Sequence, residues 1–113
     1  MNEQRVHERV NIELPASFEI AGREENLALA TTLNISSGGI CLYTKEKLSI
    51  GETLQIKVKL AHVGVVFIKV EVRWVKTFDI LVSEEYQIGV RLLDSSDPDE
   101  AKFVEFCKGI IKP

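Results

Sequence analysis

Strict alternation of apolar and polar side chains marks the stretch Leu54-Gln55-Ile56-Lys57-Val58-Lys59-Leu60. Successive side chains of a β-strand point to opposite faces of its sheet, so this stretch would bury four aliphatic side chains and expose two lysines. Residues 66–74 repeat the pattern after a short turn that contains Gly64. The two segments together predict an antiparallel hairpin whose one face is buried.

The same period of two recurs on both sides of this hairpin. In residues 27–33 the alternation assigns Leu27, Leu29 and Leu33 to the apolar face. With the hairpin, these segments predict six antiparallel strands, and closure into a barrel or a sandwich would protect the edges of the sheet. The further alternating segments are residues 10–20, 27–33, 40–42 and 86–92.

The last part of the chain changes its period. Asp97 suits the N-cap of a helix and Pro98 suits its first turn. Phe103 and Cys107 then lie on one apolar stripe with a helical spacing. We therefore expect one domain over residues 1–113, with an all-β barrel at 10–93 and a C-terminal helix at 97–111.

Composition and charge exclude several classes of protein. The chain has 113 residues, of which 45% are hydrophobic and 27% charged, as in a globular domain. Its net charge of −3 disfavours general binding to nucleic acid, and it has no apolar run of the ~20 residues that a membrane span needs. The polar residues 1–5 contain no signal peptide, so we expect a cytoplasmic protein.

Catalytic and metal sites find little support. Cys41 and Cys107 lie in apolar surroundings and are expected to be buried free thiols, although a disulfide stays open. His7 and His62 have no neighbouring ligands or nucleophile in the sequence, so neither a metal site nor an enzyme is predicted. An oligonucleotide-binding barrel would need a basic groove with exposed aromatic rings, and the sequence offers neither clearly.

Two polar features exceed what the barrel requires. The first is Arg5-Val6-His7-Glu8-Arg9, with two arginines four residues apart before the first strand. The second is Asn34-Ile35-Ser36-Ser37-Gly38-Gly39, between the second and third strands. Alone, each is an ordinary charge cluster or a tight turn. We call them the arginine motif (residues 5–9) and the turn motif (residues 34–39).

In this order, and with this strand pattern, the two motifs resemble the signature of PilZ domains. The resemblance implies a six-stranded antiparallel barrel that acts as a receptor for the second messenger cyclic di-GMP, with no metal or other cofactor. It implies that Arg5 and Arg9 grip phosphates and guanine edges. Asn34, Ser36 and Gly39 would form the opposing wall. Guanidinium groups pair bidentately with phosphate or with guanine, which agrees with this role.

Three further residues are weaker candidates for the ligand site. Gln4 and Gly38 adjoin the two motifs. Trp74 lies near the ligand if the resemblance holds, whereas its alternation with Val70 and Val72 predicts a core residue.

Residues 1–9 contain no apolar run and are expected to be a flexible arm that the ligand orders. The output would be a signal to an effector protein. The alternatives are a ligand-independent adaptor on the same fold, for instance in motility or pilus assembly, and an oligonucleotide-binding barrel.

Overall fold

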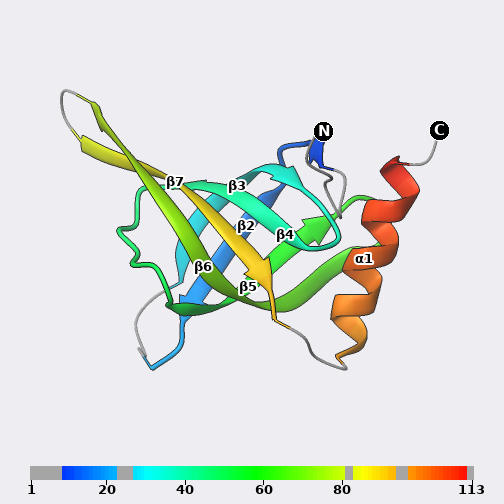
Figure 1. The fold of residues 1–113 in the computed structure, drawn as a ribbon. Coiled ribbons are helices and arrows are strands. Elements are labelled where there is room, and N and C mark those ends of the chain that lie inside the picture. Colours follow the sequence, from blue (N-terminus) through cyan, green and yellow to red (C-terminus); the bar gives the residue numbers. More distant parts are fainter. Residues whose placement is uncertain (1–8, 23–26, 81–82, 94–96, 112–113) are drawn as a thin grey trace, which may run out of the picture.

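A computed structural model describes residues 9–22, 27–80, 83–93 and 97–111. Strands make up most of the described chain, and one helix follows them (Figure 1). The elements are β1 (Val10–Asn11), β2 (Pro15–Ile20), β3 (Ala28–Ile35), β4 (Gly39–Thr44), β5 (Thr53–Leu60), β6 (Gly64–Ile80), β7 (Ser83–Leu92) and α1 (Pro98–Ile111).

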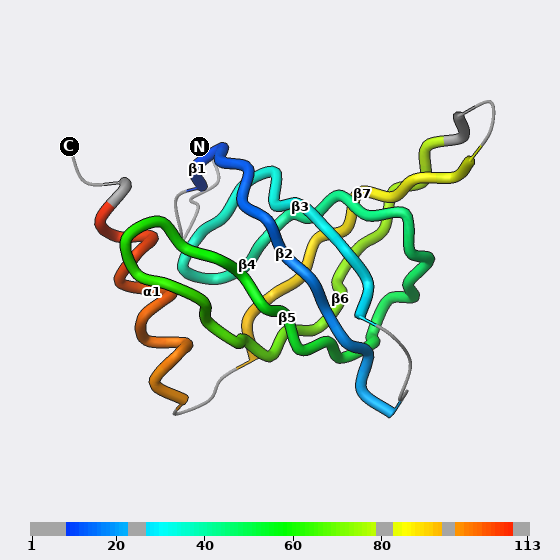
Figure 2. Tube along the Cα trace, turned by 180° about the vertical axis from the view of Figure 1, so that it is seen from behind, coloured from blue at the N-terminus to red at the C-terminus, as the bar shows by residue number. Residues whose placement is uncertain are grey.

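Strands β2 to β7 form a closed antiparallel barrel. Their order is β3-β2-β5-β6-β7-β4, and β4 pairs with β3 to complete the ring. The two-residue β1 pairs with β3 on the edge opposite β4, in line with β2. The predicted fold class, an all-β six-stranded barrel with a C-terminal helix, is therefore confirmed. Figure 2 shows the same ring from behind, with α1 beside it.

The core comes from the strands whose alternation is regular. All four aliphatic side chains of residues 54–60 are buried, and Lys57 and Lys59 between them are exposed. Strand β6 contributes the buried Val66, Ile68, Val70 and Val72. Burial of a side chain of this size stabilises the fold by roughly 1.5–3 kcal/mol, so these two strands supply much of the hydrophobic free energy.

The predicted first strand over residues 10–20 is divided into β1 and β2. The hydroxyl of Thr32, which is fully buried, accepts a hydrogen bond from the amide of Leu14 (2.8 Å) and donates one to the carbonyl of Ile12 (2.7 Å). In the segment between β1 and β2, the Thr32 side chain thus takes the place of regular backbone hydrogen bonds to β3. Pro15, which has no N–H to donate, then opens β2.

The assignment of Leu27, Leu29 and Leu33 to the core was wrong. Leu27 and Leu29 are exposed, and Leu33 is only partly buried. Strand β3 instead turns Ala28 and Ala30 inward. Its register pairs Phe18 with Ala28, so a small side chain lies beside the large buried ring. A β-bulge between Thr32 and Asn34 then shifts the register, and Ile35 comes back into the core.

Helix α1 packs against β6 and β1. The side-chain oxygen Oδ1 of Asp97 accepts a hydrogen bond from the amide of Asp99 (3.0 Å), as expected of an N-cap. Phe103 and Cys107 are fully buried in the barrel core. The carboxylate of Asp99 accepts a hydrogen bond from the amide of Phe67 (2.9 Å), so the start of the helix also holds the edge of β6.

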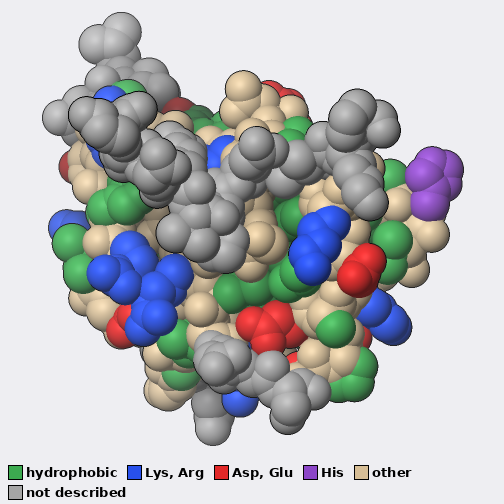
Figure 3. Space-filling model, turned by 45° about the vertical axis from the view of Figure 1, so that its right-hand side comes forward, with side chains coloured by type: hydrophobic (Ala, Val, Ile, Leu, Met, Phe, Trp, Pro, Cys, Tyr) green, Lys and Arg blue, Asp and Glu red, His purple; other side chains and the backbone are tan. Residues whose placement is uncertain are grey.

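Surface charge is mixed. On the face that Figure 3 shows, basic and acidic side chains lie among hydrophobic ones. The one helix of the described chain is too short to cross a membrane. Cys41 and Cys107 are buried free thiols, in agreement with the sequence.

Candidate functional site

The described part of the arginine motif meets the turn motif through one hydrogen bond. Arg9 Nη1 donates to Asn34 Oδ1 over 2.7 Å. Strand β1 makes this contact possible, because Asn11 is the register partner of Asn34 and Arg9 stands just before β1. Arg5, Gln4 and the remainder of the arm over residues 1–8 lie outside the described residues.

Ser36 holds the turn between β3 and β4 together. Its side chain is buried, and its hydroxyl oxygen accepts hydrogen bonds from the amides of Gly38 (3.2 Å) and Gly39 (3.1 Å). The same hydroxyl donates to the carbonyl of Gly39 (3.3 Å). The hydroxyl is thus occupied by the backbone of the turn, where it holds Gly38 and Gly39 in place.

Gly39 is buried where β4 meets β7. A Cβ on this residue would lie 2.4 Å from the carbonyl oxygen of Val90, a contact that real Cβ atoms do not make. Packing between two strands is therefore a reason for glycine here that the sequence motif does not reveal. Gly38 is partly buried beside it.

Four residues from four neighbouring strands form a row across the sheet. Asn34 on β3 pairs with Cys41 on β4, Cys41 pairs with Gly89 on β7, and Gly89 pairs with Trp74 on β6. We call these four residues the transverse row. Register partners share a face of a sheet, so Asn34 and Trp74 mark the two ends of one outward face.

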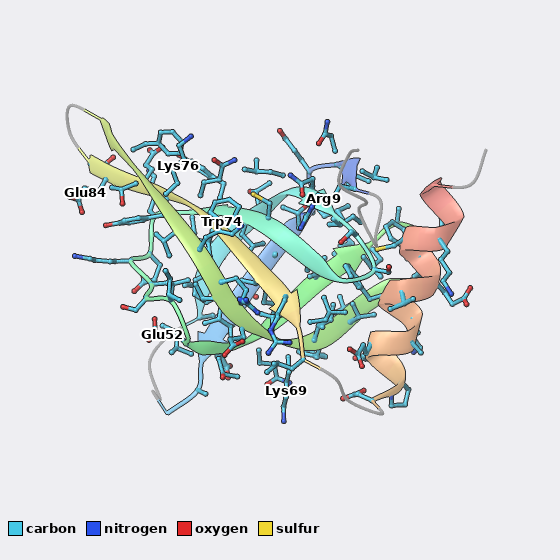
Figure 4. All side chains as sticks on the ribbon, in the orientation of Figure 1. Arg9, Glu52, Lys69, Trp74, Lys76 and Glu84 are labelled. Carbon is cyan, nitrogen blue, oxygen red and sulfur yellow. The ribbon has the colours of Figure 1, made fainter. Side chains whose placement is uncertain are left out.

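The prediction that Trp74 is a core residue was wrong. Its side chain is 43% exposed. A β-bulge between Val72 and Trp74 shifts the register of β6 against β7. Val72 faces the core before the bulge, and the next side chain of β6 that packs against the core is Val75. An extra residue in one strand reverses the alternation beyond it. Arg9 and Trp74 lie along the same barrel face in Figure 4.

Cys41 lies between these two ends of the transverse row. Burial raises the pKa of its thiol, while the positive charge of Arg9 and a hydrogen bond with Gln87 act in the opposite direction. Sequence reasoning did not single out Cys41, Gln87 or Gly89 as members of a site. Only Gly89, a glycine inside a strand, carries a local signal of close approach.

The chemistry of this face is suited to binding. It offers a guanidinium for anions or guanine edges, an amide for hydrogen bonds, and an exposed indole for stacking. Among the described residues, no group of three or more His, Cys, Asp and Glu side chains comes together to hold a metal.

Comparison with solved structures finds the same fold. The PilZ domain of YcgR from Escherichia coli with c-di-GMP is similar to this chain, with a TM-score of 0.76, 14% identity, and coverage of 97% of this chain and 93% of that one. The K. pneumonia MrkH–c-di-GMP complex gives a TM-score of 0.76 and 22% identity, with 97% and 52% covered. The Bacillus subtilis inhibitor of motility MotI gives 0.71 and 20%, with 99% and 54% covered.

The chain thus spans about half the length of MrkH and of MotI. No sequence among the curated proteins matches it. The model of the PilZ domain family matches residues 3–109, which is nearly the whole chain and includes both motifs. The chain therefore belongs to the PilZ domain family.

Proposed function

We propose that this chain is a receptor for cyclic di-GMP and that the outward face between Arg9 and Trp74 is its ligand site. The observation that carries the proposal is the 2.7 Å hydrogen bond from Arg9 to Asn34, which joins the two motifs of the family signature on one face of the barrel. Membership of the family and the complexes of YcgR and MrkH with c-di-GMP support this ligand.

The chemistry of the ligand fits the residues of this face. Cyclic di-GMP carries two phosphates and two guanines. A guanidinium has five N–H donors, and one of those on Arg9 is used by Asn34 in the described chain. The others suit a phosphate or the O6 and N7 atoms of guanine. By its place in the motif, Arg5 is the second arginine of the proposed site.

Asn34 and the turn residues have different proposed roles. The hydrogen bond from Arg9 orients the amide of Asn34, and this amide can in turn donate to the ligand. Ser36, Gly38 and Gly39 would act mainly through the shape of the turn, because the Ser36 hydroxyl already bonds to both glycines. Gly39 has no side chain that would keep a flat base from the backbone.

The proposed output is a signal to another protein, without any chemistry on the ligand. Two similar structures have outputs of different kinds, since MotI is described as an inhibitor of motility and MrkH as a transcription regulatory factor that depends on c-di-GMP. For this chain we propose an effector protein as the partner. Its mixed surface charge and net charge of −3 speak against general binding to nucleic acid.

Isothermal titration calorimetry with cyclic di-GMP tests the proposal, with GTP and GMP as control ligands. We expect a saturable heat with cyclic di-GMP alone. Arg9→Ala and Asn34→Ala should each weaken binding by about ten- to a hundredfold, because a hydrogen bond to a charged group contributes roughly 1.5–3 kcal/mol. Lys59→Ala is the matched control, since Lys59 is an exposed cation on β5, separated from β3 by β2. Absence of binding by the unaltered chain would refute the proposal.

A further inference from the structure

Gly89 and Trp74 are in unusually close contact. A Cβ built on Gly89 would lie 2.0 Å from Nε1, 2.2 Å from Cε2 and 2.7 Å from Cδ1 of the Trp74 indole. All three atoms belong to the five-membered ring of the indole, so this ring occupies the space that a side chain of residue 89 would take. Trp74 is nevertheless 43% exposed. The indole thus lies on the backbone of β7 and remains accessible to a ligand.

The backbone of Gly89 does not itself require glycine. Among the described glycines, a positive φ occurs at Gly22, Gly51 and Gly64, and Gly89 is not one of them. Gly39 differs in another way, because its missing Cβ would meet a backbone carbonyl that cannot move aside. At Gly89 the obstacle is a side chain with two rotatable bonds. A methyl group at this position would therefore displace the indole before it disturbed the barrel.

We propose that Gly89 is a positioning residue that seats the Trp74 indole at one end of the transverse row, where the ring serves as a stacking platform for a guanine of cyclic di-GMP. The inference rests on the proposed function and adds to it the means by which the platform is held. Asn34 and Trp74 are separated by three inter-strand steps, or roughly 14 Å. The face between them has a cation at one end and an aromatic ring at the other.

Seating the ring before the ligand arrives has a physical advantage. An indole that is free to rotate loses this freedom on binding, and the loss weakens affinity. An indole held against a glycine has lost it already. The contact also covers the backbone of Gly89, which is buried, in an arrangement in which an aromatic ring compensates for the missing side chain of a glycine in a strand. Both effects depend on the absence of a Cβ at residue 89.

Fluorescence tests the contact between the Trp74 indole and Gly89, which we call the seat, without any ligand. Trp74 is the only tryptophan of the chain, so the intrinsic emission reports on it alone. We expect Gly89→Ala to shift the emission to longer wavelength and to increase quenching by acrylamide, because the displaced ring enters solvent. Gly109→Ala is the matched control, since a Cβ there meets nothing within 4 Å. An unchanged spectrum and unchanged quenching in Gly89→Ala would overturn the proposed seat.

Calorimetric titration with cyclic di-GMP then tests the role of the seat in binding. We expect Gly89→Ala to raise Kd by about tenfold, which is within the contribution of one base stacked on an aromatic side chain. In a Trp74→Ala background the same substitution should change Kd by less than about twofold, because its target is absent. A full tenfold effect in that background would mean that Gly89 acts on the fold and not through Trp74.

The outcomes separate this inference from the proposed function. If the unaltered chain does not bind cyclic di-GMP, the proposed function and the stacking role both fail, while the fluorescence experiment still decides the seat. If the unaltered chain binds and Gly89→Ala binds equally well, only the positioning role fails. If Gly89→Ala does not fold, the Trp74→Ala/Gly89→Ala double variant decides: it folds if the indole is what the methyl group displaces, and its failure to fold contradicts the inference.

Discussion

Gly39 and Val90 approach each other so closely that the carbonyl oxygen of Val90 lies 2.4 Å from the place where a Cβ of Gly39 would be. This contact joins the end of the turn motif to β7. The residue that the family signature assigns to the ligand is therefore also needed for strand packing. A loss of ligand binding after substitution of Gly39 can come from either cause, and measurements of stability separate them.

Gly39→Ala should destabilise the barrel. The methyl group would push β4 from β7, and overpacking of this kind costs typically about 1–3 kcal/mol. Chemical denaturation measures the loss. Gly109→Ala is the control, because it adds a methyl group to an exposed helical position and should be neutral or stabilising by about 0.5–1 kcal/mol. Equal stability of Gly39→Ala and the unaltered chain would contradict the packing role.

Ser36→Ala should lower stability through the turn. It removes the hydroxyl that accepts from the amides of Gly38 and Gly39. A buried donor left without a partner costs roughly 1–3 kcal/mol. Thermal unfolding and calorimetric titration with cyclic di-GMP, both performed on Ser36→Ala, check this. We expect the midpoint temperature of unfolding to fall. We expect the affinity of Ser36→Ala for cyclic di-GMP to fall less than that of Arg9→Ala. A large loss of affinity at unchanged stability would instead indicate direct contact between the hydroxyl and the ligand.

Thr32→Val should be among the most destabilising conservative substitutions. The two side chains have the same shape, but valine leaves the amide of Leu14 and the carbonyl of Ile12 without the hydroxyl. We expect a loss of about 2–6 kcal/mol, from roughly 1–3 kcal/mol for each of the two groups that lose their partner. Thr31→Val, on the neighbouring outward position, should change stability by less than about 0.5 kcal/mol. Denaturant titration of both variants gives the comparison.

The buried Cys107 should make stability fall at alkaline pH. Burial raises the pKa of its thiol from 9.0 to about 11, so the thiol of the unfolded chain loses its proton at a lower pH than that of the folded chain. The stabilisation is complete below pH 9 and is lost as pH rises toward 11, by up to about 2–3 kcal/mol. The free energy of unfolding of the unaltered chain should fall over this range, whereas Cys107→Ala has no thiol at this position and should lack this loss. The difference in the free energy of unfolding between the two chains should therefore change by this amount between pH 9 and pH 11. A constant difference would refute the linkage.

Arg9 and Asn34 should behave as one unit in ligand binding. Because Arg9 donates to Asn34, removal of either disturbs the other. A double-mutant cycle with alanine at both positions should show that the double variant loses less affinity than the two single losses added together. Additive losses would mean that the two residues contact the ligand independently. Stability should change little in all three variants, because the hydrogen bond is at the surface.

The sequence predicted well where each strand keeps one register. In β5 the side chains alternate without interruption, so both the buried positions and the exposed Lys57 and Lys59 followed from the pattern. The prediction failed at Leu29 and at Trp74 for different reasons. In β3 the small Ala28 and Ala30 face the core and the larger Leu27 and Leu29 face outward, so the size of the apolar side chains indicated the wrong face. Trp74 was assigned to the core because an apolar side chain at the expected spacing looks the same whether or not a bulge intervenes. Bulges depend on pairing between distant strands, which a local pattern does not contain.

The candidate site was predictable to the extent that short motifs define it. Asn34 and Arg9 were both chosen from the sequence and are hydrogen-bonded in the structure. Gly89 and Cys41 were not chosen, since their relation to Trp74 and Asn34 arises only when β7 pairs with β4 and with β6. The identity of neighbours across a sheet follows from register and topology, and neither can be read from a single segment.

The hydrogen bond between Asp99 and the amide of Phe67 has a consequence for self-association. β7 pairs with β6 only from Val70 onward, and the amide of Leu93 donates to the carbonyl of Lys69, so residues 64–68 of β6 would otherwise present a free sheet edge. Free edges template the addition of a strand from another molecule. The first turn of α1 is bonded to this edge and Phe103 is buried in the core, so α1 covers the edge of β6 and would prevent another molecule from adding a strand there. We expect a chain cut before α1 to expose this edge and to self-associate.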